Sequence, residues 1–479
     1  MPRTWLFPSC VLAVALAPER GPRAEPTTTS PPSQTSPSQT SPSQASPPQA
    51  SPPQTALHVA FERYKLPNGL TVILHEDHRL PQVVVDVLFR VGSKDERAHR
   101  TGFAHLFEHL MFMGTKNVPN GRFDQLMEAW GGQNNAATSE DRTNYFEMGP
   151  SHLLETFLWL EADRLATLPD DMTKDKVDLQ RDVVKNERRQ TYENRPYGRV
   201  ELALPEHLYP DGHPYHHPVI GSHADLTAAS VDDVKAFFRG YYVPSNAQLV
   251  VAGDFRPDEA RRLIERWFGW MPRLPEPEHA APKPTRLARA ERVVLRDAVE
   301  LEQVTLAWSS PEDGGTGDAE CELLAALLGL GKSSRLQRAL VYEQKLAQEI
   351  IVEQRASRYG GTLVIVATAQ PGHTAAELER AIDAELARLQ TGAPPTEREV
   401  ERARALTQAK KLEEVSALFM LADALNQMEF RYGDPGLLDY SLVGRYQPLK
   451  AADVLGQARA VLAQPRLTVT VLPAAGEKK

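Results

Sequence analysis

Cysteine is almost absent from this 479-residue chain, which contains only Cys10 and Cys321. Two cysteines are too few for a disulfide framework or a thiolate metal site, so any metal ion must be bound by histidine and carboxylate side chains. Basic clusters are also lacking, since 54 lysines and arginines stand against 63 acidic residues and the net charge is -9. Without a positive field to gather phosphates, the composition argues against a nucleic-acid partner.

Long apolar runs are missing as well, and no transmembrane segment is expected. The apolar run from Trp5 to Ala17 follows Arg3 and is too short to span a bilayer. This pattern is typical of a secretory signal, so residues 1–25 are predicted to contain one and the chain to be exported, to the periplasm or outside the cell. A lipid anchor at Cys10 is disfavoured because the residues before it are a poor lead-in.

Apolar residues are scarce from position 26 to 56, where repeated Pro, Ser, Thr and Gln units dominate. A segment of this composition has nothing to bury, so it cannot offset the entropy that folding removes. We therefore expect an extended, disordered tether between the signal region and the folded part.

Two stretches with a similar order of elements follow the tether, and they predict two homologous domains. The first is expected at 57–271 and the second at 291–479, with a linker rich in proline and charge at 272–290 between them. Both alternate β-branched strands with helical patterns, although no residue-level repeat is visible. The expected fold class is α+β, with two mixed α/β sandwich-like domains in tandem. Strands are expected at 69–77, 81–93, 247–255, 291–297, 301–310, 362–372 and 467–473, and helices at 102–114, 121–131, 151–167, 173–195, 320–330, 333–344 and 396–432.

The string HLFEH at residues 105–109 carries the strongest chemical signal. On a helix, His105 and His109 stand one turn apart on the same face and can hold one metal ion together. Glu108 lies on the same side, where its carboxylate can take a proton from metal-bound water. The order H-x-x-E-H is the reverse of the zinc-binding motif H-E-x-x-H. The plain alternative is an amphipathic helix with two surface histidines.

A catalytic zinc site needs a third protein ligand and leaves the fourth position to water. Glu187 is the best candidate, because it lies in a strongly helical run at 173–195 that can cross the motif helix. Glu193 and Glu201 are nearby alternatives, and chemistry alone leaves the choice among the three open.

These motifs resemble the pitrilysin, or M16, family of metallopeptidases, whose members include insulin-degrading enzyme and the mitochondrial processing peptidase. In that family H-x-x-E-H is followed about seventy-five residues later by a ligand glutamate, which matches Glu187 in VVKNERR. The stretch 131–147 resembles the family's substrate-binding edge strand, with Asn135, Ala136 and Thr138 at its N-A-x-T positions. The likeness extends from about Leu57 to the C-terminus.

The resemblance implies a zinc-dependent endopeptidase with one Zn²⁺ per chain. Its ligands would be His105, His109 and Glu187, and Glu108 would be the general base on zinc-bound water. Peptides or unfolded protein segments would bind as an added strand along the 131–138 edge. The two domains would form half of a peptidase chamber.

The sequence departs from the family at two places. Several relatives have a supporting glutamate seven residues before the ligand glutamate, and here that position is Gln180. Single-chain relatives also have an arginine and a tyrosine in the second half that grip the substrate carbonyl, and the matched positions are Val341 and Gln348. The resemblance to two-chain members therefore predicts a related partner subunit that supplies the Arg/Tyr pair. A shifted alignment would instead select Arg338 with Tyr342 or Arg355 with Tyr359.

Other functions compete with peptide hydrolysis. A non-catalytic peptide-binding or assisting subunit would keep the fold but lose the chemistry, and the intact HLFEH argues against it. A zinc-dependent scaffold would bind the metal and cleave nothing. His213, His216 and His217 could form a second metal site, although the surrounding prolines and glycines favour a loop.

Overall fold

The computed structural model describes residues 59–279, 282 and 285–474. The signal predicted within 1–25, Cys10 and the tether predicted at 26–56 lie outside these residues, so the signal, the tether and export stay predictions. Across the described part of the chain, no helix combines the length and the apolar character that crossing a membrane requires.

The first half of the chain contains a six-stranded sheet in the order β1-β2-β6-β3-β5-β4. β2 and β6 are parallel, and all other neighbours are antiparallel. Among the described strands β4 pairs with β5 alone, which confirms the edge strand expected within 131–138. The strands are β1 (Glu62–Lys65), β2 (Thr71–Glu76), β3 (Gln82–Phe89), β4 (Gln133–Thr138), β5 (Thr143–Pro150) and β6 (Ala247–Gly253).

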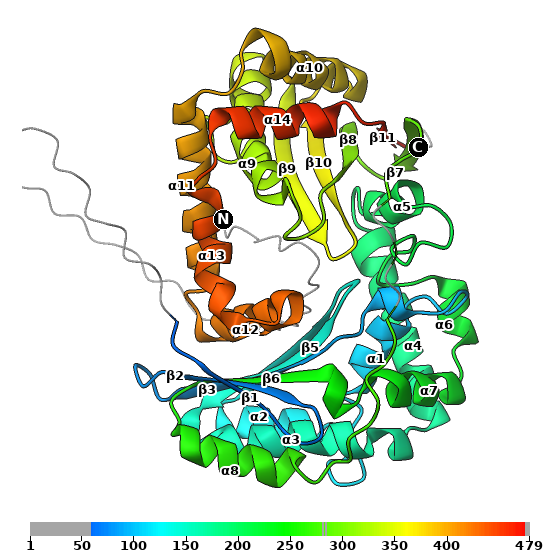
Figure 1. Ribbon diagram of the computed structural model, residues 1–479. Coiled ribbons are helices and arrows are strands. Elements are labelled where there is room, and N and C mark those ends of the chain that lie inside the picture. The colour runs from blue at the N-terminus through cyan, green and yellow to red at the C-terminus, as the bar shows by residue number, and fades with distance from the viewer. Residues whose placement is uncertain (1–58, 280–281, 283–284, 475–479) are drawn as a thin grey trace, which may run out of the picture. The chain divides into compact units, whose positions relative to one another are not determined.

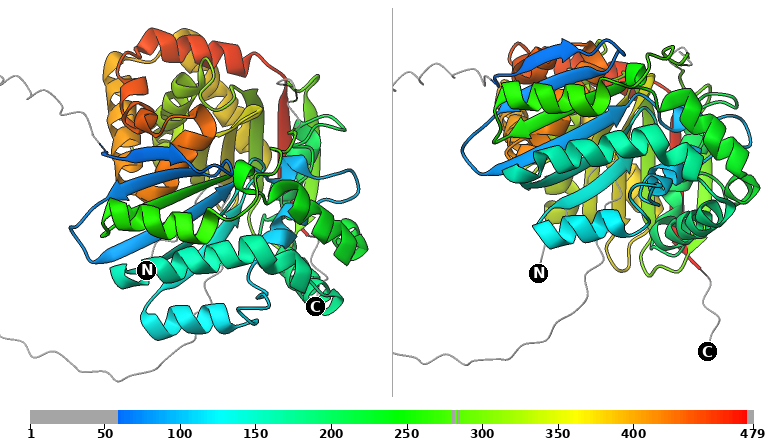
Figure 2. Two further views of the ribbon diagram at one scale, coloured as in Figure 1. Left: turned by 60° about the horizontal axis from the view of Figure 1, so that its bottom comes forward. Right: turned by 90° about the horizontal axis from the view of Figure 1, so that it is seen from below.

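The alternation of side chains along β3 explains how this sheet is covered. Val83, Val85 and Val87 point to one face and join the main apolar core of this half. Helices α3 (Leu154–Thr167) and α8 (Pro257–Phe268) lie on that face (Figures 1 and 2). The other helices of this half are α1 (Phe103–Leu110), α2 (Arg122–Trp130), α4 (Lys174–Arg188), α5 (Arg199–Leu208), α6 (His223–Ala228) and α7 (Val231–Tyr241).

The second half contains a five-stranded sheet in the order β7-β11-β8-β10-β9. Its first pair is parallel and the rest are antiparallel, so it repeats the pattern of β2-β6-β3-β5-β4 strand for strand. The tandem repeat expected from the element order is thus present in the topology. The strands are β7 (Glu291–Asp297), β8 (Gln303–Ser310), β9 (Ala347–Ser357), β10 (Gly360–Ala369) and β11 (Arg466–Pro473).

Strand β9 was missed by the sequence prediction, which placed no strand between 344 and 362. The helix expected at 333–344 is present at 335–343, and its main part, Gln337–Glu343, is π-helical. β9 has many polar residues at half-buried positions, so it lacks the apolar alternation by which strands are recognised. The helices of this half are α9 (Asp318–Gly329), α10 (Ala375–Ala387), α11 (Glu397–Glu414), α12 (Leu418–Tyr432), α13 (Leu438–Leu442) and α14 (Ala451–Leu462).

Each half covers one face of the other half's sheet with a helix. Val200, Leu204 and Leu208 of α5 pack against the second sheet and form an apolar cluster with it. In return, α12 packs on β3 and β6 of the first sheet, on the face opposite α3 and α8 (Figure 1). The ring of Phe419 stacks on Phe146 with centroids 3.8 Å apart.

Buried polar contacts fix α12 in one position on the first sheet. Asp86 points to the α12 face of β3, where the Asn426 side-chain amide donates to its carboxylate at 2.9 Å and to its carbonyl at 3.1 Å. Burial, followed by the charge of Asp423, raises the pKa of Asp86 to about 7. Nearer the rim, the Arg63 guanidinium donates twice to Glu429 at 2.7 Å.

We predict that Asn426→Ala lowers the free energy of unfolding by about 1–3 kcal/mol, because it removes the donor to the buried Asp86 Oδ2, while Asp86 Oδ1 keeps its hydrogen bond from Asn144. Urea unfolding measures the loss. Asn120→Ala is the matched control, since Asn120 is exposed. An Asn426 variant as stable as this control would show that the α12 contact does not depend on the hydrogen bonds.

Candidate metal centre

Helix α1 presents both motif histidines because its other residues face the core. Phe103, Leu106 and Leu110 are buried in the first domain, which leaves His105 and His109 one turn apart on the adjacent face. The two rings lie 4.8 Å apart between centroids, with their planes at 81°. The histidine pair is thus positioned by the packing of the helix that carries it.

The start of α1 is held by contacts that the sequence analysis did not identify. The carboxylate of Glu96 accepts hydrogen bonds from the backbone amides of Gly102 at 2.9 Å and Ala104 at 2.7 Å. It therefore satisfies amides that have no partner at the first turn of a helix. Gly102 has a φ of +86°, and a Cβ on Gly221 would lie 2.4 Å from its Cα. Glycine at both positions lets the segment before α1 approach the segment around Gly221 closely.

Helix α4 brings the third candidate ligand to this pair. It packs against α1 and carries Glu187 next to its last residue, before a π-helical turn at Arg189–Glu193. One oxygen of Glu187 lies 3.7 Å from His105 Nε2 and the other 3.3 Å from His109 Nε2. Ligand atoms of these three residues all lie within 4.8 Å of one another.

The electrostatics of the three residues suit a metal ion. Burial, and then the charge of His109, lowers the pKa of His105 to about 4, so its imidazole is neutral near pH 7 and keeps a lone pair to donate. Burial opposes ionisation of Glu187, but the hydrogen bond with His109 and the two imidazoles lower its carboxyl pKa. Two imidazoles and a carboxylate are a donor set found in catalytic zinc sites, so the residues fit zinc.

Glu108 lies beside this set and is not part of it. Burial raises the pKa of Glu108 to about 7, against the effect of a hydrogen bond from Thr138. The Thr138 hydroxyl donates to Glu108 Oε2 at 2.5 Å, and it comes from the last residue of the edge strand β4. The edge strand and the carboxylate are thereby in direct contact.

The alternative carboxylates have other partners. Glu193 accepts from Arg188 and contacts His223, both at 2.9 Å. Glu201 is paired with Arg355 at 2.9 Å. Of the three glutamates considered from the sequence, only Glu187 joins the histidines in the described structure.

Gln180 lies beside the candidate ligands, where the sequence analysis placed a supporting residue. Its side-chain amide contacts the Met113 sulfur at 2.7 Å and also interacts with His109. An amide carries no charge, so it can orient the imidazole without competing for the metal.

Asn135 and Ala136 lie in the middle of β4. Asn135 Oδ1 accepts from the amide of Ala136 at 2.8 Å, and Ala136 is 2% exposed. The backbone of β4 is the feature available for pairing, because this strand is at the sheet edge.

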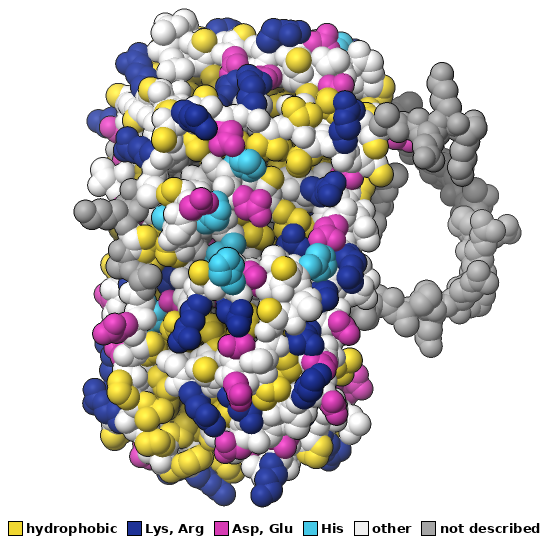
Figure 3. All heavy atoms as spheres, turned by 90° about the vertical axis from the view of Figure 1, so that its right-hand side faces the viewer, with side chains coloured by type: hydrophobic (Ala, Val, Ile, Leu, Met, Phe, Trp, Pro, Cys, Tyr) yellow, Lys and Arg dark blue, Asp and Glu magenta, His cyan; other side chains and the backbone are white. Residues whose placement is uncertain are grey.

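The three histidines considered as a second metal site do not converge in the structure. His213 stacks on Tyr209 with ring centroids 4.7 Å apart. His216 contacts Asp211 at 3.1 Å, and His217 lies 3.6 Å from Glu96. Within the described residues, the grouping of metal-binding side chains is that of His105, His109 and Glu187. Figure 3 shows histidines and carboxylates gathered on the side of the molecule where α5, α6 and α7 lie.

The corresponding helix contact in the second half holds ion pairs. Helices α9 and α11 pack as α1 and α4 do, and Lys411 Nζ lies 3.0 Å from Glu322. Arg445 lies 2.5 Å from Asp318, and the Tyr446 hydroxyl donates to Glu322. These carboxylates are neutralised by side-chain cations and present no imidazole.

The positions matched to the family's arginine and tyrosine offer little to a substrate carbonyl. Val341 packs partly buried on the second core, and Gln348 is exposed on β9. In the shifted alignment, Arg355 is engaged by Glu201 and Glu353. Tyr342 is 49% exposed and Arg338 is 3.6 Å from Glu343.

Comparisons with known proteins show the family of this chain. A family model described as insulinase, peptidase family M16, matches residues 71–220, and one described as the peptidase M16 inactive domain matches 228–407. The chain is 30% identical over 421 residues to a protein named zinc protease PqqE of Helicobacter pylori, covering 86% of this chain and 92% of that one. It is 31% identical over 322 residues to an uncharacterized zinc protease of Mycobacterium leprae, covering 65% and 70%.

Two solved structures are similar in fold. A protease from Helicobacter pylori superposes with a TM-score of 0.80 at 29% identity and covers 87% of this chain and 100% of that one. The periplasmic protease PqqL from Escherichia coli superposes with a TM-score of 0.73 at 20% identity, covering 87% of this chain but 48% of that one. The longer protein thus contains this fold within about half of its length.

We predict that Glu187→Ala loses most of its zinc affinity, because two imidazoles alone make an incomplete site. Metal analysis after dialysis against a zinc buffer measures the effect. Glu193→Ala and Gln180→Ala serve as matched controls and should keep most of the metal, since neither side chain is a ligand. Equal zinc loss in Glu193→Ala would show that Glu187 is not the specific third ligand.

Proposed function

The chain belongs to the M16 peptidase family, and we propose that it is a zinc-dependent endopeptidase that cleaves peptides or unfolded protein segments. The observation that carries this proposal is the convergence of His105, His109 and Glu187 beside the buried carboxylate of Glu108. One Zn²⁺ per chain would be held by the three converging side chains. When bound, zinc supplies Lewis acidity for the peptide carbonyl and for the attacking water.

Glu108 is the proton carrier in this proposal. Its pKa of about 7 lets its carboxylate accept a proton from the attacking water and return it to the leaving amine near neutral pH. The hydroxyl of Thr138 holds Glu108 Oε2 and leaves the other oxygen for the proton. Burial of the Glu108 carboxyl excludes bulk water, which would otherwise stabilise its charged form and lower its pKa.

The substrate is proposed to bind along β4 as an added antiparallel or parallel strand. β4 is at the sheet edge, so the backbone groups on its outer side can pair with an extended peptide, and the Ala136 amide would exchange its hydrogen bond with Asn135 Oδ1 for one with the peptide. Asn135, Ala136 and Thr138 are the proposed contacts, and Thr138 would act through its backbone because its hydroxyl is bonded to Glu108. Backbone pairing tolerates many side chains, which supports a broad peptide specificity.

We predict that Glu108→Gln retains zinc but loses at least a hundredfold in kcat, because glutamine keeps the shape and removes the base. A quenched fluorescent peptide with and without a chelator measures hydrolysis, and metal analysis measures zinc. Glu128→Gln is the matched control at an exposed position of α2. Undiminished hydrolysis by Glu108→Gln would remove Glu108 from the mechanism. A wild-type chain that binds zinc and still cleaves nothing after its partner is added would favour the scaffold function.

A related partner subunit is proposed to complete the site. The side chain of Val341 has no hydrogen-bond donor, and the exposed side-chain amide of Gln348 is a poor substitute for a tyrosine hydroxyl. The fold also occupies only about half of the longer PqqL chain, which supports pairing with a second half. The partner would supply the arginine and tyrosine donors for the developing negative charge.

We predict that the isolated chain is at least a hundredfold less active than the chain mixed with its partner, as expected when a donor to the oxyanion is missing. The assay compares the purified chain alone with the chain after addition of a related protein that lacks H-x-x-E-H. Size-exclusion chromatography of the mixture tests whether the two associate. Full activity of the isolated monomer would refute the partner requirement.

A further inference from the structure

The short segment Gly92–Glu96 lies between β3 and α1, and we call it the bracket segment. It contacts the turn that follows Thr138 and the start of the helix that carries Glu108. Toward β4, the amides of Ser93 and Lys94 donate to the carbonyls of Ser139 at 3.1 Å and Glu140 at 3.0 Å. Toward α1, its Glu96 carboxylate accepts from the first amides of the helix that carries Glu108. One piece of chain therefore positions the donor and the acceptor together.

The bracket segment lies against the β4–β5 turn without space between them. A Cβ on Gly92 would be 2.4 Å from the carbonyl oxygens of Ser139 and Glu140, a distance that side chains do not tolerate. The turn follows directly after Thr138, the last residue of β4. A displacement of this turn must consequently move the Thr138 hydroxyl.

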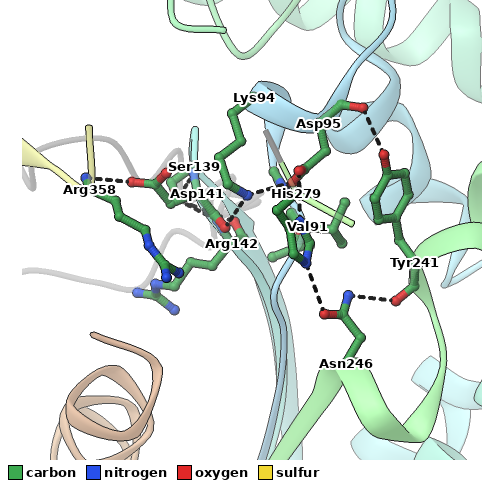
Figure 4. Close-up of polar contacts among 12 residues, drawn as sticks. Val91, Lys94, Asp95, Ser139, Asp141, Arg142, Tyr241, Asn246, His279 and Arg358 are labelled. Carbon is green, nitrogen blue, oxygen red and sulfur yellow. Dashed lines mark hydrogen bonds and ion pairs between the residues drawn. The ribbon is translucent and has the colours of Figure 1, made fainter. Parts of the chain in front are cut away.

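Lys94 joins the bracket segment to the turn through its side chain. Its ammonium lies 2.5 Å from Asp95 Oδ2 and donates to the carbonyl of Asp141 at 3.1 Å (Figure 4). The side chains of Lys94 and Asp95 are 2% and 1% exposed. Two charges buried this far are kept only when they are paired and hydrogen-bonded, so the ammonium is confined to this place.

Both partners of Lys94 are held by distant parts of the chain. His279, in the linker, contacts Asp95 Oδ1 at 2.8 Å, and Gly92 N donates to Asp95 Oδ2 at 3.1 Å. The carboxylate of Asp141 accepts from the hydroxyl of Tyr215 at 2.6 Å and from the backbone amide of Arg358 at 2.9 Å. Arg358 belongs to the hairpin between β9 and β10, so the second half reaches the same turn (Figure 4).

We propose that Lys94 is a positioning residue for the general base, because it fixes the turn after β4 and thereby the Thr138 hydroxyl that orients Glu108. The inference rests on the proposed peptidase function. Lys94 acts through the turn and Thr138. It is predicted to affect the catalytic rate and to leave zinc binding unchanged, because Lys94 bonds to the turn after β4, whereas the start of α1 is held by Glu96.

A double-mutant cycle tests the connection from Lys94 to Glu108. In the full chain, with the partner present if activity requires it, Lys94→Met and Thr138→Val should each lower kcat about tenfold to a hundredfold, the size expected from a small misplacement. KM should change less than about twofold, and zinc content should not change. The double variant should lose no more than the larger single loss, because both changes remove the same orientation of Glu108.

Arg445→Met is the matched control for the loss of a buried ion pair. Arg445 and Asp318 are 9% and 3% exposed and lie in the second half. This variant should lower the melting temperature and keep the kcat of the folded protein. If Lys94→Met does not fold, Lys94→Gln, which keeps an amide donor toward the Asp141 carbonyl, replaces it in the cycle with a smaller expected loss.

The possible results separate the outcomes. Independent losses that multiply in the double variant would overturn the proposal, and so would an unchanged kcat in both Lys94 variants. A loss of zinc or a rise in KM with constant kcat would reassign Lys94 to metal or substrate binding. A wild-type protein without chelator-sensitive hydrolysis would instead refute the peptidase function itself, and the positioning role with it.

Discussion

The packing of a helix from each half on the sheet of the other half determines the positions of both sheets. A sheet in this fold has helices of its own on one face only, and its second face is apolar enough to need a cover. Helix α5 supplies that cover for the second sheet and α12 for the first. Because α12 packs on β3 and β6, the position of the central strands depends on residues more than 300 positions away in the chain, such as Asn426 on Asp86.

Neighbouring strands connect the position of β3 to the candidate catalytic residue Glu108. β3 pairs with β5, β5 pairs with the edge strand β4, and Thr138 at the end of β4 bonds to Glu108. The second half contacts the same edge again where Arg358 meets Asp141. Burial of Glu108 raises its pKa toward neutrality, and its one strong donor opposes that rise only in part. The proposed general base and the proposed substrate-binding edge therefore share one structural support.

The two repeats show how one fold can keep or lose a metal site. In the first repeat, α1 and α4 bring two imidazoles and one carboxylate together, with their ligand atoms within 4.8 Å of one another and no lysine or arginine among the three. In the second repeat, the contact between α9 and α11 places Glu322 beside Lys411, with Arg445 close by. Side-chain cations already neutralise that carboxylate, so no ion is required. The difference lies in a few side chains on these helices and on the nearby turn Gly444–Tyr446.

The sequence by itself determined the parts that depend on local pattern. The β-branched run of β3 and the helical spacing of HLFEH placed the strand and the histidine pair, because both are local features of the sequence. The family resemblance added Glu187, which chemistry alone could not choose over Glu193 and Glu201. The tertiary structure decided what depends on contacts between distant residues. It revealed β9, whose polar residues hide its strand pattern, and the crossing of α5 and α12 between halves. It also brought Lys94, Asp141 and Thr138 together, since long-range packing leaves no local signal in the sequence.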